Sequence, residues 1–257
     1  MQQSGFNVNL SGARVLITGA SSGIGEHFAR VVAAHGGHAL ICARRKERLD
    51  DLVADIYLAG GHASAFAMDV RDRVSVREAV EQASLDGPIT ALINNSGIAH
   101  GNPLEKESDS DWDDVIATNL TGARNVAVET ARHMIATESG GSIVNIASIL
   151  GLRQGMHVSA YATSKAGLVQ LTRQMALEWA RYKIRVNAIA PGYIDTPIND
   201  GYLSSEAGMA MVKRIPQRRI GKLADLDGPL LLLLSQASAY MTGTIIPVDG
   251  GHLLTPL

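Results

Sequence analysis

The chain is poor in cysteine, which limits its covalent chemistry. Its one cysteine among 257 residues is Cys42, so no disulfide can form within the chain. The N-terminal segment MQQSGFNVNL lacks the basic-then-apolar pattern of a secretory signal. The longest leucine run, residues 230–234, is far shorter than the roughly 18 apolar residues that a membrane span needs. We therefore expect a cytoplasmic protein that has no membrane partner.

An excess of charge of one sign is also absent. The 23 basic and 25 acidic residues give a formal net charge of -2, which offers no electrostatic basis for binding nucleic acid. The eight histidines form no HExxH motif and have no paired spacing with the cysteine, so we predict no metal site. The partner that we expect is a small molecule.

Short β-branched segments alternate with longer segments of helical periodicity. Such an alternation predicts βαβ units and a parallel sheet that is covered by helices on both faces, an α/β fold. With 46% hydrophobic residues, the chain can form one large core, and we expect a single domain over residues 1–257 with residues 1–10 as an N-terminal tail. The expected strands are residues 14–18, 38–43, 63–70, 89–95, 142–148, 184–191 and 243–250, and a long helical segment lies near 108–137.

A glycine-rich turn, TGASSGIG, follows the first expected strand and opens a helix. Its glycines Gly19, Gly23 and Gly25 have the spacing G-x3-G-x-G, which departs from the usual GxGxxG. At this position glycines let backbone amides and a helix N-terminus approach a pyrophosphate. The turn therefore indicates a dinucleotide site.

The same turn also matches GxSxG, the nucleophile elbow of α/β hydrolases, with Ser21 as the nucleophile. Asp249 and His252 downstream would complete the order Ser, Asp, His. The elbow needs an oxyanion loop built upstream, whereas only the N-terminal tail precedes this strand. A serine hydrolase is thus a remote alternative.

The motif YATSKAG places Tyr161 and Lys165 four residues apart at the start of an apolar helical segment. Residues at this spacing share one helix face, so the phenol and the ammonium can reach one point in space. An ammonium beside a tyrosine favours the phenolate and lowers its pKa from the ordinary value of about 10. The pair is suited to proton transfer.

Further motifs add to this pair. The segment Asn94–Gly97, Asn119 and Ser148 occur with the glycine turn and YxxxK in the order and spacing of one family. From about residue 10 to residue 251, the chain resembles the short-chain dehydrogenase/reductase family, in particular its 3-oxoacyl-acyl-carrier-protein reductase-like and related ketone or alcohol dehydrogenase members. Ser96 is a departure, because the family usually has alanine there. The resemblance implies a Rossmann-like, doubly wound, seven-stranded parallel sheet.

The resemblance also assigns roles to residues. It implies that Tyr161 is the general acid/base, that Ser148 hydrogen-bonds the substrate oxygen, and that Asn119 keeps a water in a proton relay. Lys165 would also hold the nicotinamide ribose. Asp69 and Val70 would contact the adenine, Asn95 and Gly97 the adenosine ribose side, and Ile194 and Thr196 the nicotinamide carboxamide, while Gly19, Ser21, Ser22, Gly23, Ile24 and Gly25 would form the pyrophosphate turn.

The second expected strand ends in ICARRKERL, which bears on the choice of dinucleotide. Ala43 stands where an NAD site places an acidic residue, and Arg44 and Arg45 follow it. A guanidinium suits a phosphate, so we predict NADP(H), with Arg44 as the main contact. The alternative interpretation is that Arg44 and Arg45 are only solvated basic residues before the next helix. In addition, Ser22 stands in the glycine turn where many NADP-preferring relatives have a second basic residue. NAD(H) stays an alternative.

The substrate is the least determined feature. The resemblance implies a pocket formed by Leu150, Met156, His157 and Tyr193 beside Ser148 and Tyr161, with residues 198–215 as a lid. This moderately apolar set favours a ketone or 3-oxoacyl-type substrate over a sugar alcohol, and thus a carbonyl reductase or secondary-alcohol dehydrogenase. An NAD(H)-dependent polyol dehydrogenase and a non-catalytic dinucleotide-binding regulator are the alternatives. By resemblance the protein is expected to form a homotetramer or homodimer.

Overall fold

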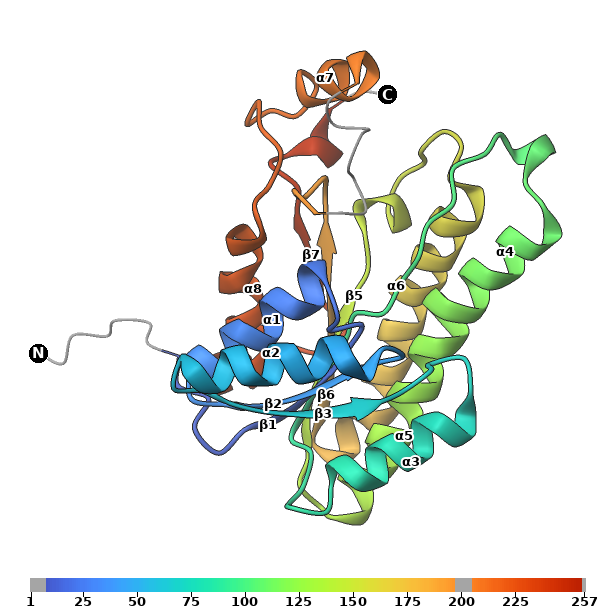
Figure 1. The fold of residues 1–257 in the computed structure, drawn as a ribbon. Helices are drawn as coiled ribbons and strands as arrows, with labels where there is room; N and C mark the ends of the chain where they lie inside the picture. Colours follow the sequence, from blue (N-terminus) through green and yellow to red (C-terminus); the bar gives the residue numbers. More distant parts are fainter. Residues whose placement is uncertain (1–7, 197–204, 256–257) are drawn as a thin grey trace, which may run out of the picture.

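The computed structural model describes residues 8–196 and 205–255, and its centre is one seven-stranded parallel sheet (Figure 1). The strand order is β3-β2-β1-β4-β5-β6-β7, which confirms the doubly wound sheet expected from the sequence. The strands are β1 (Arg14–Thr18), β2 (His38–Ala43), β3 (His62–Ala67), β4 (Ala91–Asn94), β5 (Gly141–Ile146), β6 (Ile184–Pro191) and β7 (Ile245–Val248).

The strand order reverses between β1 and β4, which lie side by side with Ile17 opposite Ile93. From β1 the chain continues to β2 and β3 on one side, and from β4 it continues to β5, β6 and β7 on the other. Ligands of such sheets bind beyond the carboxyl ends of the strands at this reversal. The fold thus places a ligand site next to the glycine turn that follows β1.

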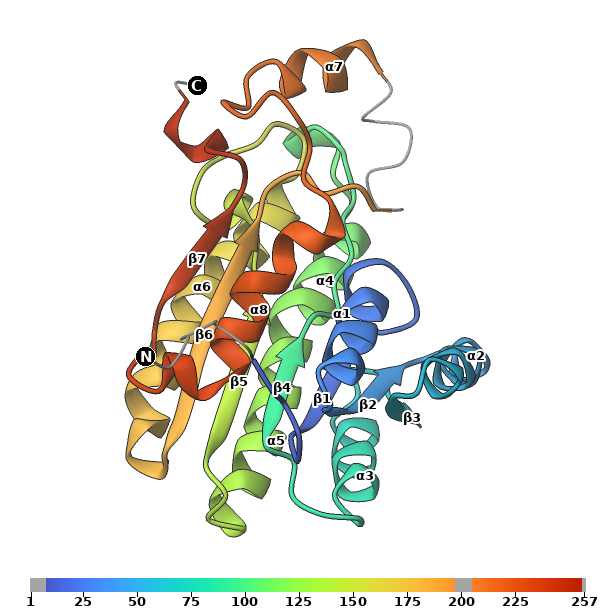
Figure 2. The same ribbon diagram turned by 90° about the vertical axis from the view of Figure 1, so that its left-hand side faces the viewer.

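Helices cover both faces of the sheet. The helices α1 (Gly23–Ala34), α2 (Lys46–Leu58) and α8 (Asp227–Leu234) pack on one face, and α3 (Arg73–Ala83), α5 (Ala123–Ala136) and α6 (Ser159–Trp179) pack on the other (Figure 2). Alternate strand residues enter the two cores, so Ile17 packs beneath α1 while its neighbour Leu16 packs in the opposite cluster. Burial on both faces explains why the strands are nearly continuous apolar segments.

The long helix expected near 108–137 is present, but one turn of it is widened. It consists of α4 (Asp109–Ile116), a π-helical segment (Ala117–Gly122) and α5. Asn119 in the π-helical segment bonds to the backbone of Ile98, outside the helix. Such π-helical turns occur frequently at functional sites.

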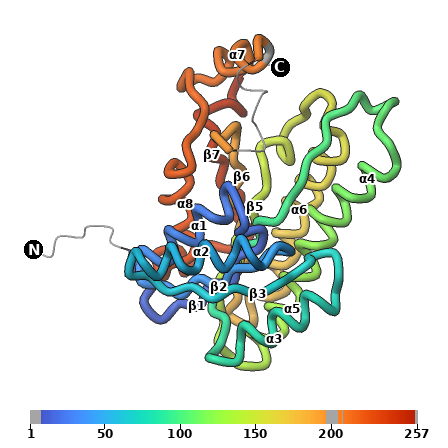
Figure 3. Tube along the Cα trace, in the orientation of Figure 1, coloured from blue at the N-terminus to red at the C-terminus, as the bar shows by residue number. Residues whose placement is uncertain are grey.

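The helix α7 (Glu206–Val212) and the C-terminal turn His252–Leu254 lie beyond the carboxyl ends of β6 and β7 (Figure 3). The described part of the predicted lid, residues 205–215, contains α7, while residues 197–204 lie outside the described residues. Leu10, the last residue of the predicted tail, is only 4% exposed and packs in the core. In the described ranges no helix is both long and apolar enough to cross a membrane.

Candidate active site

The glycine turn leaves the start of α1 open to a ligand. Gly19 and Gly23 have φ angles of +66° and +58°, in the left-handed region that favours glycine. At Gly25 a Cβ would meet the Gly19 carbonyl oxygen and would lie 2.5 Å from the Asn95 amide nitrogen, so only glycine fits there. The side chain of the N-cap residue Ser22 makes no capping bond. The first-turn amides of α1 are therefore available to an anion.

The turn is fastened to the end of β4. The Thr18 hydroxyl oxygen accepts hydrogen bonds from the backbone amides of Asn95 and Ser96, both at 3.0 Å. The Asn95 side-chain amide donates to the carbonyls of Thr18 and Gly19, at 3.0 and 3.3 Å. The side-chain amide of Asn95 thus holds the glycine turn in shape. A contact of Asn95 with the adenosine ribose would have to use its other atoms. Ser96 fits against Gly19 through its Cα and hydroxyl, so its departure from alanine leaves the backbone role intact.

Ser148, Tyr161 and Lys165 come together just beyond the carboxyl end of β5. Ser148 is 7% exposed, and its hydroxyl oxygen accepts a hydrogen bond from the Leu150 amide at 3.1 Å. The Ser148 hydroxyl lies close enough to the Tyr161 phenol to lower its pKa. The Lys165 ammonium lies 5.6 Å from the centre of the Tyr161 ring. The structure therefore gathers the three side chains that the sequence singled out.

Burial controls the electrostatics of this group. It raises the pKa of the Tyr161 phenol, and the nearby Ser148 hydroxyl acts on this pKa in the opposite direction. Burial also lowers the pKa of Lys165 from 10.5 to about 8. The Lys165 ammonium donates to the Ile146 carbonyl at 2.8 Å, and a Cβ at Gly97 would lie 3.5 Å from its nitrogen. Glycine at position 97 thus leaves space beside the ammonium.

Asn119 lies in the same buried network. Its Oδ1 accepts from the Ile98 amide at 2.8 Å, and its Nδ2 donates to the Ile98 carbonyl at 2.9 Å and to the Ser164 hydroxyl at 3.1 Å. Both side-chain donors are therefore used within the protein. A water in the predicted relay would have to donate to the second lone pair of Oδ1 or bond to the backbone.

The other half of the site begins at the end of β2. Ala43 closes the strand with no carboxylate, and Arg44 and Arg45 are exposed. Partial burial of Asp69 raises its pKa, but hydrogen bonds from Arg71 and the charges of Arg71 and Arg44 outweigh this effect and leave it lowered. Arg44 therefore lies within electrostatic range of Asp69. The two residues predicted to contact the adenosine end share one side of the site.

Val70 is nearly buried beside Asp69. Its carbonyl accepts from the Asn125 side chain at 3.1 Å, and a Cβ at Gly122 would meet its methyl group at 2.6 Å. Val70 thus packs against the end of the π-helical segment. Its predicted contact with the adenine would use the part of the side chain that is still exposed.

The residues predicted for the nicotinamide and the substrate follow β6 and β5. Ile194 and Thr196 are 2% and 7% exposed, and a hollow of about 330 Å³ beyond β6 and β7 is lined by Tyr193 and Ile194 among others. Met156 is 82% exposed, and His157 is exposed with a φ of +64°. These last two residues lie on the surface of the loop between Ser148 and Tyr161, so the structure places them at the rim and not deep in the site.

The residues of the hydrolase alternative do not form a triad. The Asp249 carboxylate accepts from the backbone amides of Gly251 and Leu253, at 2.9 and 2.7 Å. The His252 ring instead lies 5.8 Å from the Tyr193 ring. Across residues 8–196 and 205–255, no hydrogen bond joins the side chains of Ser21, Asp249 and His252, and Asp249 and His252 are linked only through a backbone bond at 3.2 Å. The GxSxG match is part of the dinucleotide turn.

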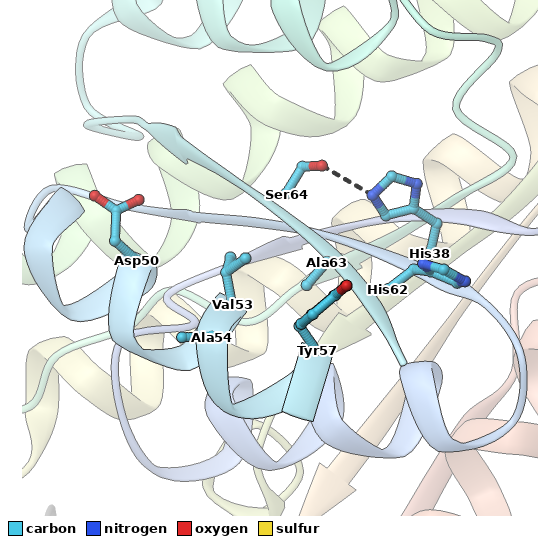
Figure 4. A pocket seen from close by; sticks show the side chains of 8 residues that line it. All are labelled: His38, Asp50, Val53, Ala54, Tyr57, His62, Ala63 and Ser64. Carbon is cyan, nitrogen blue, oxygen red and sulfur yellow. Dashed lines mark hydrogen bonds between the residues drawn. The ribbon is translucent and has the colours of Figure 1, made fainter. Parts of the chain in front are cut away.

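Another hollow, of about 450 Å³, lies away from these residues (Figure 4). It is formed by α2 and by β2 and β3, with His38 and His62 as the first residues of the two strands. The His38 ring nitrogen bonds to the Ser64 hydroxyl at 2.9 Å. Because it opens from the edge of the sheet and starts at the amino ends of the strands, it is not the site that the motifs indicate.

Sequence reasoning missed two contacts at the substrate loop, which is the segment 149–158 that joins Ser148 to α6. Arg153 donates to the His252 carbonyl at 2.8 Å and ties the loop after Ser148 to the C-terminal turn. The Glu107 carboxylate accepts from the Ser159 hydroxyl, at the start of α6. In both pairs the partners are far apart in sequence, so no local pattern signals them.

Comparisons with known proteins identify the family of the chain. The sequence profile described as short chain dehydrogenase matches residues 13–207. The chain belongs to this family. The short-chain dehydrogenase is 38% identical over 248 residues to a 3-oxoacyl-acyl-carrier-protein reductase of Thermotoga maritima, covering 96% of this chain and 100% of the relative. It is 37% identical over 245 residues to a gluconate 5-dehydrogenase of Gluconobacter oxydans, covering 95% of each.

Solved structures show the same relationship. A gluconate 5-dehydrogenase from Burkholderia cenocepacia, in complex with NADP and tartrate, superimposes with a TM-score of 0.94 at 35% identity, covering 97% of this chain and 98% of that one. This short-chain dehydrogenase is therefore an oxidoreductase that uses a dinucleotide cofactor.

Proposed function

We propose that this short-chain dehydrogenase interconverts a ketone and a secondary alcohol with NADP(H) as the cofactor. The observation that carries the proposal is the group of buried Ser148, half-buried Tyr161 and buried Lys165 beyond the carboxyl end of β5, at the same edge of the sheet as the glycine turn after β1. Hydride transfer to a carbonyl carbon leaves charge on its oxygen, and this group supplies a proton and a positive charge there.

The chain's residues fit the cofactor. The open N-terminus of α1 suits the pyrophosphate, and the space beside Gly97 and the Lys165 ammonium suits the nicotinamide ribose. At the adenosine end, Ala43 leaves room and Arg44 offers a charge for the 2′-phosphate of NADP(H). When bound, NADP(H) supplies the hydride. The NADP named in the Burkholderia cenocepacia structure supports this choice over NAD(H).

The three side chains divide the proton chemistry between them. The Ser148 oxygen accepts from the Leu150 amide, and in the presence of substrate its one hydroxyl proton can turn from the Tyr161 phenol to the substrate oxygen, while Tyr161 gives up its phenol proton to the same oxygen. Lowering a tyrosine pKa from about 10 to about 7 requires roughly 4 kcal/mol. The Lys165 ammonium, 5.6 Å from the ring centre, is the nearby positive charge that favours the phenolate, and the positive nicotinamide of the oxidised cofactor would add to it.

For the substrate we propose a ketone of the 3-oxoacyl thioester type. The exposed apolar side chains of Leu152 and Met156 at the rim of the substrate loop support an apolar substituent, as does the name of the Thermotoga maritima relative. A sugar-acid ketone is the second candidate, favoured by the names of the Gluconobacter oxydans and Burkholderia cenocepacia proteins. A homotetramer or homodimer is proposed by family resemblance, and sedimentation at micromolar concentration would test it.

Turnover of a substrate panel separates these possibilities. NADPH consumption is measured with simple ketones, a 3-oxoacyl thioester and 5-ketogluconate, for the wild type and for Tyr161→Phe, with NADPH binding followed by fluorescence. We expect turnover of at least one carbonyl by the wild type and its loss in the variant. Binding of NADPH without turnover of any carbonyl would support the non-catalytic regulator instead.

A further inference from the structure

The catalytic helix α6 has no local cap at its start. Its N-cap residue, Val158, has no side-chain acceptor, and α6 begins at Ser159, two residues before Tyr161. The first amides of a helix have no partner within the helix, so an uncapped first turn frays. Tyr161 lies in this first turn. The position of the phenol therefore depends on whatever fixes the helix start.

Glu107 occupies the position of the missing cap. It lies in the segment between β4 and α4, which runs alongside the start of α6 (Figure 1). Its Oε2 accepts from the Ser159 hydroxyl at 2.5 Å, and its Oε1 lies 3.4 Å from the Ala160 amide nitrogen, which donates to it. A carboxylate at a helix N-terminus also interacts favourably with the helix dipole.

The contact between Glu107 and the start of α6 is shielded from water, and the segment that carries Glu107 is fixed to α6 at a second point. Glu107 is half-buried and Ala160 is 2% exposed, so water competes weakly for the bond to the amide. The segment that carries Glu107 begins at Ile98, whose backbone is bonded in both directions to Asn119. Asn119 bonds in turn to Ser164, one turn beyond Tyr161 in α6. The segment 98–108 is therefore fastened to α6 on both sides of Tyr161.

We propose that Glu107 is a positioning residue, which fixes the first turn of α6 so that the Tyr161 phenol meets Ser148. This inference rests on the proposed function of Tyr161. Without Glu107 the first turn loses two acceptor atoms, and the phenol departs from its position beside Ser148. Misplacement of about 1 Å costs up to roughly a hundredfold in rate, so partial loosening should cost about tenfold.

The pH dependence distinguishes positioning from simple support of the fold. The Tyr161 phenol faces Ser148 and the Lys165 ammonium, and the nearby Ser148 hydroxyl lowers its pKa. If the phenol moves away from Ser148, the pKa of Tyr161 rises. Because alcohol oxidation needs the phenolate as base, the acid-side limb of its pH profile then moves to higher pH. Removal of the negative charge of Glu107 alone would lower the pKa of Tyr161. Glu107→Gln removes the charge and keeps an acceptor, so it separates the two effects.

The experiment compares Glu107→Ala, Glu107→Gln and the control Glu105→Ala, which alters an exposed carboxylate in the preceding 3₁₀ turn. We expect Glu107→Ala to lower kcat about tenfold and to leave the KM for NADPH within about twofold, because the dinucleotide contacts lie elsewhere. Its pH midpoint should move to higher pH. Glu107→Gln should recover most of kcat, and Glu105→Ala should match the wild type.

A second readout makes the result independent of turnover. The Tyr161 phenol is titrated by carbon-13 NMR of tyrosine-labelled protein, with its signal assigned from Tyr161→Phe. A higher phenol pKa in Glu107→Ala than in both other variants supports the proposal, even if no carbonyl substrate is found and the proposed function fails. An unchanged phenol pKa in Glu107→Ala overturns the positioning role, whether or not its melting temperature falls.

Discussion

Replacement of Lys165 by methionine should stabilise the protein at neutral pH while it removes activity. Lys165 is 4% exposed, and burial lowers its pKa from 10.5 to about 8. A lowered pKa of a basic group means that the charged ammonium destabilises the folded state relative to the unfolded state. Methionine has a similar length and carries no charge, so it relieves this cost.

The size of the effect follows from the same pKa. The drop from 10.5 to about 8 corresponds to at most about 3 kcal/mol of lost stability at pH 7. The substitution also removes the hydrogen bond to the Ile146 carbonyl, and a buried carbonyl without a partner costs about 1 to 2 kcal/mol. The net gain is about 1 to 2 kcal/mol, which raises the melting temperature by about 2 to 8 °C in a chain of this size.

The gain should depend on pH in a defined direction. Between pH 8 and 10.5 the unfolded chain keeps a proton on this lysine that the folded wild type has released, so wild-type stability rises with pH in this window. Lys165→Met lacks this rise, and its advantage should shrink between pH 7 and pH 10. Calorimetric melting of the cofactor-free proteins measures this difference in stability between the variant and the wild type at each pH. Lys106→Met is the control, since it changes an exposed lysine. Equal or lower stability of Lys165→Met at pH 7 would refute the reasoning.

Three further predictions concern the site. Tyr161→Phe should lower kcat by about 10² to 10⁴ while NADPH binding stays unchanged, as single-turnover kinetics and fluorescence titration would show. The wild type should prefer NADPH by about ten- to a hundredfold, since charge-assisted bonds contribute roughly 1.5 to 3 kcal/mol, and Ala43→Asp/Arg44→Ile should lose or reverse this preference. Equal KM values for NADH and NADPH in the wild type would contradict the role of Arg44. Asn119→Ala should destabilise the fold by about 1 to 3 kcal/mol in denaturant unfolding, because it leaves both backbone groups of Ile98 without their partner.

The sheet was predictable because its strands are buried on both faces and therefore appear as apolar segments. The β6 strand has the predicted limits, residues 184–191. The last strand is shorter than the predicted 243–250, since it ends at Val248, where Asp249 and the positive φ angles of Gly250 and Gly251 begin a turn. The third strand likewise ends before Asp69, whose backbone amide bonds to the Ser75 hydroxyl and leaves the sheet. Turn chemistry, and not hydrophobicity, set these limits.

The grouping of Ser148, Tyr161 and Lys165 was predictable for a different reason. Tyr161 and Lys165 share a helix face by their spacing alone, and Ser148 follows a strand whose carboxyl end must lie at the ligand edge of a parallel sheet. Exposure was not predictable in the same way. Met156 and His157 lie between these residues in sequence, yet they project from the loop surface, because a loop of this length can turn outward between two fixed ends.

Asn119 shows where local reasoning ends. As a residue within a long helical pattern it would be expected to continue the helix, and only its three bonds to Ile98 and Ser164 reveal why it is buried in a π-helical turn. The segment that begins at Ile98 carries Glu107 to the start of α6, so the widened turn and the long-range cap belong to one connected structure. A disturbance at Asn119 should therefore reach Tyr161 through both of these connections. The sequence specifies the chemical groups at their spacing, whereas contacts between distant segments determine how firmly those groups are held.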